Sequence, residues 1–198
     1  MVEPNGSSSV TNTDCSKLEE LLKAGKWQEA DSETLAIMLR ATNREQEGWL
    51  DLEHIQQYPD SGLNTINRLW LNYSNGHFGF SAQKSPWQRN SYNFSWEVGW
   101  FKTLSWANES QGRIEFQAIF DITAPQGHLP RCILINSIKR NDFVDSSRWW
   151  WGSSNFGQKW GGSFALGQKQ RDAYYCVAKA QDNCHKDLEY ILSRQYLE

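Results

Sequence analysis

The side chains that most often carry out catalysis are present but scattered. The four histidines, His54, His77, His128 and His185, are spread over a chain of 198 residues, and no recognisable pairing of acidic residues accompanies them. Cys184 and His185 are adjacent in the sequence, but neighbouring side chains on a helix point about 100° apart and do not form a nucleophile–base pair. The chain contains no GxSxG, P-loop, GxGxxG or HExxH motif. We therefore expect no catalytic residue, no metal site and no enzymatic activity.

Binding of a large, flat, apolar ligand is the chemistry that the composition favours instead. The chain has 11 tryptophans and 14% aromatic residues, and aromatic rings with a few polar groups line pockets for such ligands. The stretch LWLNYSNGHFGFSAQ (residues 69–83) sets Phe78 and Phe80 on a glycine-rich turn, and four tryptophans follow in residues 87–106. The alternative, that single rings such as Trp87 or Trp96 only fill a core, stays open.

Charge and cysteine usage exclude other classes of protein. The net charge of −3 provides no global positive field to attract nucleic acid. No apolar run reaches the roughly 18 residues that span a bilayer, so we expect no transmembrane segment. The four cysteines show no CxxC spacing. Cys176 and Cys184 would lie about 12 Å apart along a helix, beyond the roughly 7 Å limit of a disulfide, so reduced thiols are expected.

Helices are expected to build the first third of the chain. Apolar residues recur at helical spacing around residues 18–22, 35–39, 52–55 and 66–73. Gly25 is suited to end the first of these helices, Asp31 or Ser32 to cap the second, and Asp51 to start the third. Short links between the helices favour antiparallel neighbours in a bundle.

The rest of the chain is less regular in its pattern. The glycine, serine and asparagine of residues 75–106 argue against a packed helix there. The stretch IEFQAIFDI (residues 114–122) is compatible with a strand or a short helix. From about Arg171 an amphipathic helix is predicted, with Cys184, Leu188 and Ile191 facing the core and Asp187 facing solvent. His185 is expected to be solvated at the edge of this helix.

Several separate motifs resemble one known family. The opening LLKAGKWQEADSETLAIML, the later stretch GWLDLEHIQQYPDSGLNTINRLWLNYSNGHFGFSAQ, the VGW that follows and the loop APQGHLP occur in the order found in the genomes-uncoupled-four family of tetrapyrrole-binding proteins. The resemblance covers roughly residues 15–131. It implies an all-α fold, a helical bundle with a hand-like, aromatic-lined porphyrin cleft, irregular loops and a C-terminal amphipathic helix.

The resemblance also implies a function. Members of this family bind protoporphyrin and magnesium protoporphyrin and stimulate magnesium chelatase, working with its large porphyrin-binding subunit in chlorophyll synthesis. They are not catalysts and require no cofactor. On this basis we expect a cytoplasmic protein, or one of the plastid stroma after removal of a transit peptide, with peripheral association with membranes. Carried over to this chain, the family pattern predicts these porphyrin contacts: Phe78, Phe80, Val98, Trp100, Phe101, Trp106, Phe120, His128, Leu129 and Arg131.

Two of these residues have competing interpretations. Arg131 follows GHLP directly, and a guanidinium there is suited to hold a porphyrin propionate at a half-exposed rim. The alternative is an ion pair with an acid such as Asp121. His128 lies between a glycine and a leucine in the same loop, where a loop-stabilising hydrogen bond competes with a ligand contact. Trp100 is expected to be a palm residue that contacts the macrocycle.

The chain also departs from the family pattern. Phe101 follows Trp100 where the family often has a basic residue, and 68 residues follow the GHLP motif. We predict a disordered leader over residues 1–14 and one tetrapyrrole-binding domain over residues 15–198, with an insertion or extension at about residues 132–185. Two alternatives stay open. One is a bilin- or haem-binding sensor that uses the same domain, including covalent attachment of a bilin through Cys132, Cys176 or Cys184. The other is a tryptophan-rich carbohydrate-binding module.

Overall fold

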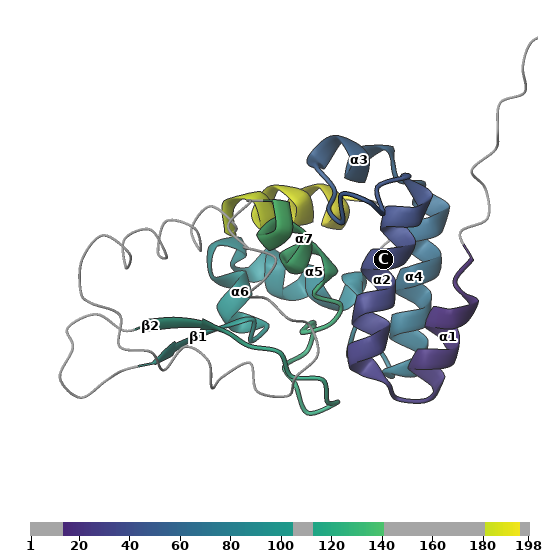
Figure 1. Ribbon diagram of the computed structural model, residues 1–198. Coiled ribbons are helices and arrows are strands. Elements are labelled where there is room, and N and C mark those ends of the chain that lie inside the picture. The colour runs from purple at the N-terminus through teal and green to yellow at the C-terminus, as the bar shows by residue number, and fades with distance from the viewer. Residues whose placement is uncertain (1–13, 105–112, 141–180, 195–198) are drawn as a thin grey trace, which may run out of the picture.

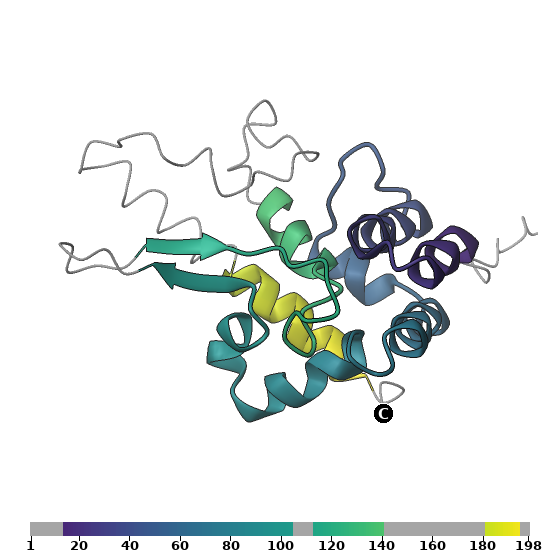
Figure 2. The same cartoon turned by 90° about the horizontal axis from the view of Figure 1, so that it is seen from below.

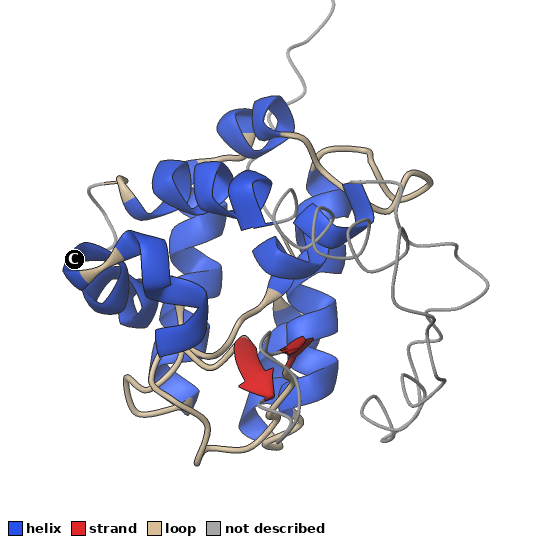
Figure 3. Ribbon diagram, turned by 90° about the vertical axis from the view of Figure 1, so that its left-hand side faces the viewer, coloured by secondary structure: helices blue, strands red, loops and turns tan. Residues whose placement is uncertain are grey.

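The computed structural model describes residues 14–104, 113–140 and 181–194, and most of these residues are helical (Figure 1). In chain order the helices are α1 (Ser16–Lys23), α2 (Trp27–Ala41), α3 (Leu52–Gln57), α4 (Asp60–Tyr73), α5 (Phe80–Arg89), the 3₁₀ turn η1 (Ser91–Asn93), α6 (Phe94–Glu97) and α7 (Cys132–Arg140). A last helix is described over residues 181–192. The predicted helical class is confirmed, and Figure 3 shows how small a part the strands form.

Within the described residues, one antiparallel hairpin is present in addition to the predicted helices. Strands β1 (Phe101–Leu104) and β2 (Arg113–Phe116) pair with Phe101 opposite Phe116, and the hairpin projects from the helical body (Figure 2). The ambiguous stretch 114–122 therefore begins as a strand and continues, from residue 117, as an irregular loop.

Helices α1, α2 and α4 lie side by side (Figure 1). Helix α1 packs against α2 and α4, and its Leu18 and Leu22 are buried. Gly25 ends this helix in the left-handed region, with φ +69°. The predicted cap of the second helix at Asp31 or Ser32 is wrong, because α2 already begins at Trp27. Asp31 therefore lies inside the helix, and its carboxylate is available to another segment.

Residues 80–97 are helical except for Asn90, contrary to our expectation. The glycines that argued against a helix occupy the turns on either side, Gly79 with φ +128° and Gly99 with φ +74°. Asn90 ends α5, and its side chain accepts a hydrogen bond from the Asn93 backbone at the start of the next turn (3.2 Å). Glycine and asparagine thus mark helix ends here, which is where such residues are favoured.

Helix α7 lies at the centre of the fold. Its residues 132–137 are all buried, and it packs against α2 and, through Ser137 and Arg140, against the last helix. Asp187 on that last helix is buried, so its predicted place on the solvent face is wrong. The reason is an ion pair that no pattern in the sequence reveals: Arg140 Nη2 lies 3.2 Å from Asp187 Oδ2.

His185, expected to be solvated at the edge of the last helix, is half-buried, and its ring lies 4.3 Å from the ring of Trp87. The predicted insertion at 132–185 begins with α7 and lies for the most part outside the described residues, as does nearly all of the predicted leader.

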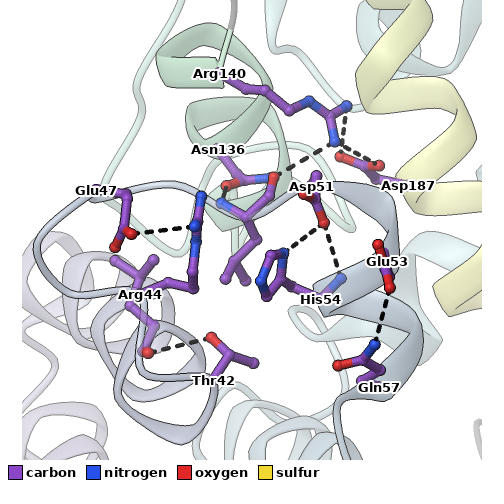
Figure 4. Close-up of polar contacts among 12 residues, drawn as sticks. Thr42, Arg44, Glu47, Asp51, Glu53, His54, Gln57, Asn136, Arg140 and Asp187 are labelled. Carbon is purple, nitrogen blue, oxygen red and sulfur yellow. Dashed lines mark hydrogen bonds and ion pairs between the residues drawn. The ribbon is translucent and has the colours of Figure 1, made fainter.

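A polar cluster joins the 43–51 loop to α7 and the last helix (Figure 4). Asn136 accepts a hydrogen bond from the Leu50 amide at Oδ1 (2.6 Å) and donates one from Nδ2 to the Leu50 carbonyl (2.8 Å). Arg140, which pairs with Asp187, also lies 3.4 Å from that carbonyl. Because Leu50 and Asn136 are both buried, water does not replace these bonds.

Replacing Asn136 with alanine tests this cluster. Asn136→Ala leaves the buried Leu50 amide without its partner, which should lower the free energy of unfolding by about 1–3 kcal/mol. The matched control is Asp182→Ala on the last helix, which removes an exposed pair with Lys186 and should change stability by less than the error of a urea titration. Equal midpoints for the two variants would contradict the structural role of Asn136.

Candidate functional site

The irregular segment from Gln117 to Arg131, hereafter the 117–131 loop, connects β2 to α7, and its last five residues are buried. Its main chain is bonded to two separate parts of the fold. The Gln117 amide donates to the Trp100 carbonyl (2.8 Å), and Gly79 donates to the Leu129 carbonyl (2.9 Å). Gly127 donates to the His77 carbonyl (3.0 Å). The loop therefore bridges the α4–α5 turn and the α6–β1 connection.

Gln83 of α5 holds the same loop from the side. Its buried side-chain amide donates to the carbonyls of Gly127 (3.0 Å) and Pro130 (2.8 Å). Gly127 has φ +78°, and a Cβ there would lie 3.1 Å from the Ala82 carbonyl oxygen. The loop approaches helix α5 so closely that a side chain at position 127 would be both strained and crowded.

His128, near the end of the loop, is a neutral ring with a hydrogen bond at each of its two nitrogens. Nδ1 lies 2.7 Å from the Val98 carbonyl, which can only accept, so Nδ1 carries the proton. Nε2 then accepts from the Ile119 amide (3.0 Å). Burial is the main cause that lowers the pKa of His128 to about 4; the hydrogen bond to Val98 opposes this shift, and the nearby positive charge of Arg131 adds to it. The expected loop-stabilising hydrogen bond of His128 is confirmed.

Arg131, at the end of the loop, is buried and not at a half-exposed rim as expected. Its Nη1 donates to the Gln117 carbonyl (2.8 Å), and its guanidinium carbon lies 5.0 Å from the centre of the Phe120 ring. Its acidic partner is Asp31 of α2, with Nε 3.7 Å from Oδ2. The suggested partner Asp121 is wrong, because that exposed carboxylate accepts from the Thr123 amide instead.

Asp31 is the most unusual residue near the loop. It is fully buried in the middle of α2, and its Oδ1 accepts a hydrogen bond from the Arg131 amide (2.6 Å). Burial raises the pKa of Asp31, and the opposing effects of the Arg131 charge and amide do not reverse that direction. A carboxylate in such a place costs stability unless it is paired, so its contact with the loop is a strong structural constraint.

The predicted porphyrin contacts fall into three groups along this bridge. Phe78 and Phe80 lie at the α4–α5 turn, Val98, Trp100 and Phe101 at the α6–β1 connection, and the other described ones on the loop itself. The ring of Phe78 lies 5.5 Å from that of Trp27, while Trp100 packs 5.2 Å from Phe94 and donates to the His128 carbonyl (2.6 Å). Trp106 lies outside the described residues.

Burial divides these residues sharply. Trp100 and the two phenylalanines at the turn have no exposed surface, and the ring of Phe120 alone among the described candidates is half-buried. Phe120 and the edge of Arg131 are therefore the predicted contacts that a ligand meets first. The fully buried residues shape the surface beneath them in this conformation.

Four residues of the site were not predicted from the sequence: Trp27, Asp31, Gln83 and Gln117. Trp27 is half-buried and lies one helical turn before Asp31, so both face the loop side of α2. Asp31 and Gln83 did carry a signal, since each is a polar residue within the apolar stripe of its helix. Trp27 and Gln117 carried none that distinguished them from other positions.

This combination defines a mostly helical protein in which buried polar contacts hold an aromatic loop that carries an arginine. A model of the GUN4-like family matches residues 8–146, which is more than half of the chain. The protein belongs to the GUN4-like family.

Known relatives agree with this assignment. The chain is 32% identical over 136 residues to the Ycf53-like protein of Synechocystis sp., covering 66% of this chain and 55% of that protein. It is 26% identical over 122 residues to the tetrapyrrole-binding protein, chloroplastic, of Arabidopsis thaliana, covering 57% of this chain and 46% of that one. The chain thus spans about half the length of these relatives.

Solved structures of the family have the same fold. GUN4 from Chlamydomonas reinhardtii matches with a TM-score of 0.50 and 27% identity, over 65% of this chain and 86% of that one. The ligand-free structure of Arabidopsis thaliana GUN4 matches with a TM-score of 0.55 over 99% of both chains, at 18% identity.

The buried neutral His128 predicts an acid-sensitive fold. Between the ordinary pKa of 6.5 and the folded value of about 4, the unfolded chain binds a proton that folded His128 does not. Stability should therefore fall as the pH drops through this window, by up to about 3 kcal/mol. In His128→Gln, which offers a donor and an acceptor but does not titrate, urea titrations should show a flatter pH dependence. An unchanged dependence would assign the acid sensitivity to another group.

Proposed function

We propose that the protein binds protoporphyrin or magnesium protoporphyrin non-covalently, on the surface formed by the 117–131 loop and the neighbouring side of α2, without catalysis of its own. Membership of the GUN4-like family and the similarity to an Arabidopsis tetrapyrrole-binding protein support the ligand class. The observation that carries the proposal is Arg131, a guanidinium fixed against the half-buried ring of Phe120. A flat macrocycle with carboxylates needs an aromatic face and such a cation.

In this proposal the residues have different roles. Phe120 stacks on the macrocycle, and Arg131 binds a propionate through parallel hydrogen bonds. The buried rings of Phe78, Phe80 and Trp100, with Val98, Phe101 and Leu129, form the floor that supports this surface. His128 keeps the loop in shape by its bonds to Val98 and Ile119.

Two of the three cysteines considered for attachment of a bilin, Cys132 and Cys184, favour non-covalent binding, and the third, Cys176, lies outside the described residues. Cys132 and Cys184 are fully buried, and burial raises the pKa of both thiols. A thiol must ionise to act as a nucleophile, so these two are unreactive in the fold. A haem sensor with an axial ligand from this loop is also disfavoured, since both ring nitrogens of His128 already have partners. A sugar-binding module finds no support in the helical fold or the family.

We further propose that the bound tetrapyrrole is presented to the large porphyrin-binding subunit of magnesium chelatase, so that the protein assists or regulates metal insertion in chlorophyll synthesis. Its place of action would be the cytoplasm or the plastid stroma, with peripheral contact to membranes. No helix in the described ranges is long and apolar enough to cross a bilayer. Adding the purified protein to a chelatase assay tests this part separately from ligand binding.

Changing Arg131 tests the proposed site. Arg131→Ala should weaken protoporphyrin binding about fivefold, which corresponds to about 1 kcal/mol, and Arg131→Lys should restore part of the loss. Binding of protoporphyrin dimethyl ester, which lacks carboxylates, should not change. Quenching of tryptophan fluorescence and the shift of the Soret band measure both affinities, and acidic acetone should extract the pigment completely.

The matched control is Arg140→Ala, which likewise removes the arginine of a buried aspartate pair but lies on α7, away from the proposed surface. It should leave the ratio of acid to ester affinity unchanged. If Arg131→Ala weakens the ester as much as the acid, Arg131 only shapes the loop. If the parent protein binds neither ligand, the proposed function fails.

A further inference from the structure

The Asp31 carboxylate makes a hydrogen bond to the main chain of Arg131 but not to its side chain. From this contact we propose that Asp31 is a positioning residue that sets the protein's preference for carboxylate-bearing ligands. The proposal rests on the proposed function and deepens it. Asp31 does not touch the ligand. Asp31 holds Arg131 in place through the main chain, and its negative charge competes with the ligand carboxylate for the positive guanidinium of Arg131.

The two oxygens of the Asp31 carboxylate do different things. Oδ1 accepts from the Arg131 amide at 2.6 Å, a short and well-formed bond. Oδ2 lies 3.7 Å from Nε of the same residue, too far for a hydrogen bond. Within the described parts of the chain, neither Oδ2 nor Nε has another hydrogen-bond partner, although both atoms are buried. The main-chain contact is thus complete, and the side-chain contact is not.

The Arg131 side chain is nevertheless held in one position. The Phe120 ring supports the guanidinium on one face, and the Gln117 carbonyl accepts from Nη1 (2.8 Å). Gln83 fixes the preceding residue by its bond to the Pro130 carbonyl (2.8 Å). A guanidinium has five N–H donors, and the hydrogen bonds described for this one engage Nη1 alone. Donors therefore remain for the two oxygens of an incoming carboxylate.

The competition follows from charge. Asp31 and a ligand carboxylate are both negative, and both interact with one cation in surroundings that exclude water, where charges act more strongly than in solvent. Removing the charge of Asp31 while keeping its Oδ1 acceptor separates the two roles. Asparagine does this, since its amide oxygen still accepts from the Arg131 amide. The attraction of Arg131 for a carboxylate should then increase, and the loop should stay in place.

The experiment compares protoporphyrin with its dimethyl ester in Asp31→Asn. The ratio of acid to ester affinity should rise at least about threefold over that of the parent protein, with ester affinity within about twofold of the parent. Combining Asp31→Asn with Arg131→Ala should lower the ratio to that of Arg131→Ala alone, because the effect of Asp31 acts through that arginine. Asp31→Ser, which also keeps an acceptor, is measured in parallel in case the asparagine variant does not fold.

Asp187→Asn is the matched control. Asp187 is equally buried and also paired with an arginine, Arg140, at 3.2 Å, but it lies on the last helix. Its ratio should equal that of the parent.

An unchanged ratio in the folded Asp31 variants, or equal loss of both ligands, would overturn the proposal and leave Asp31 a structural anchor. Failure of the parent protein to bind either ligand would overturn the proposed function instead.

Discussion

Main-chain amides and carbonyls that are buried in the interior of this fold need hydrogen-bond partners, and the packing around the 117–131 loop follows from that need. The 117–131 loop is not a helix or a strand, yet its last residues are buried, so its amides and carbonyls need partners other than water. Asp31, Gln83 and His128 supply them from three directions. Each of these polar side chains is itself buried. The loop, the helices that carry its anchors and the central helix α7 that follows it are therefore stable only together.

The two buried aspartate–arginine pairs show how one kind of interaction serves two purposes. Arg140 and Asp187 lie 3.2 Å apart, within hydrogen-bonding distance, and join α7 to the last helix. Arg131 Nε and Asp31 Oδ2 lie 3.7 Å apart, and the shorter contact of this carboxylate is the hydrogen bond that it accepts from the Arg131 amide. Burying ions is costly unless they are paired. The close Arg140–Asp187 pair fits a structural role, whereas the longer Arg131–Asp31 side-chain contact fits the proposed binding role.

Much of the fold could be predicted from the sequence, but the site only in part. Apolar spacing located α1, α3 and α4, and Asp51 caps α3 as expected. The prediction for residues 80–97 was wrong because it used the composition of a whole stretch, whereas the glycines of that stretch lie only at the helix ends. The motif GHLP located the loop correctly. The acid that meets the arginine of this loop, Asp31, lies 100 residues earlier in the chain, and no local pattern indicates which of many acids it is. Burial of Asp187 was missed for the same reason.

The proposed tetrapyrrole site lies against the 117–131 loop and the adjoining side of α2. Hydrogen exchange measured by mass spectrometry, with and without magnesium protoporphyrin, tests this location most directly. Bound ligand should slow exchange in peptides covering residues 117–131 and the first half of α2, while peptides from α3 and the last helix should exchange as before. Protection confined to α3 and the last helix, with an unchanged loop, would contradict it.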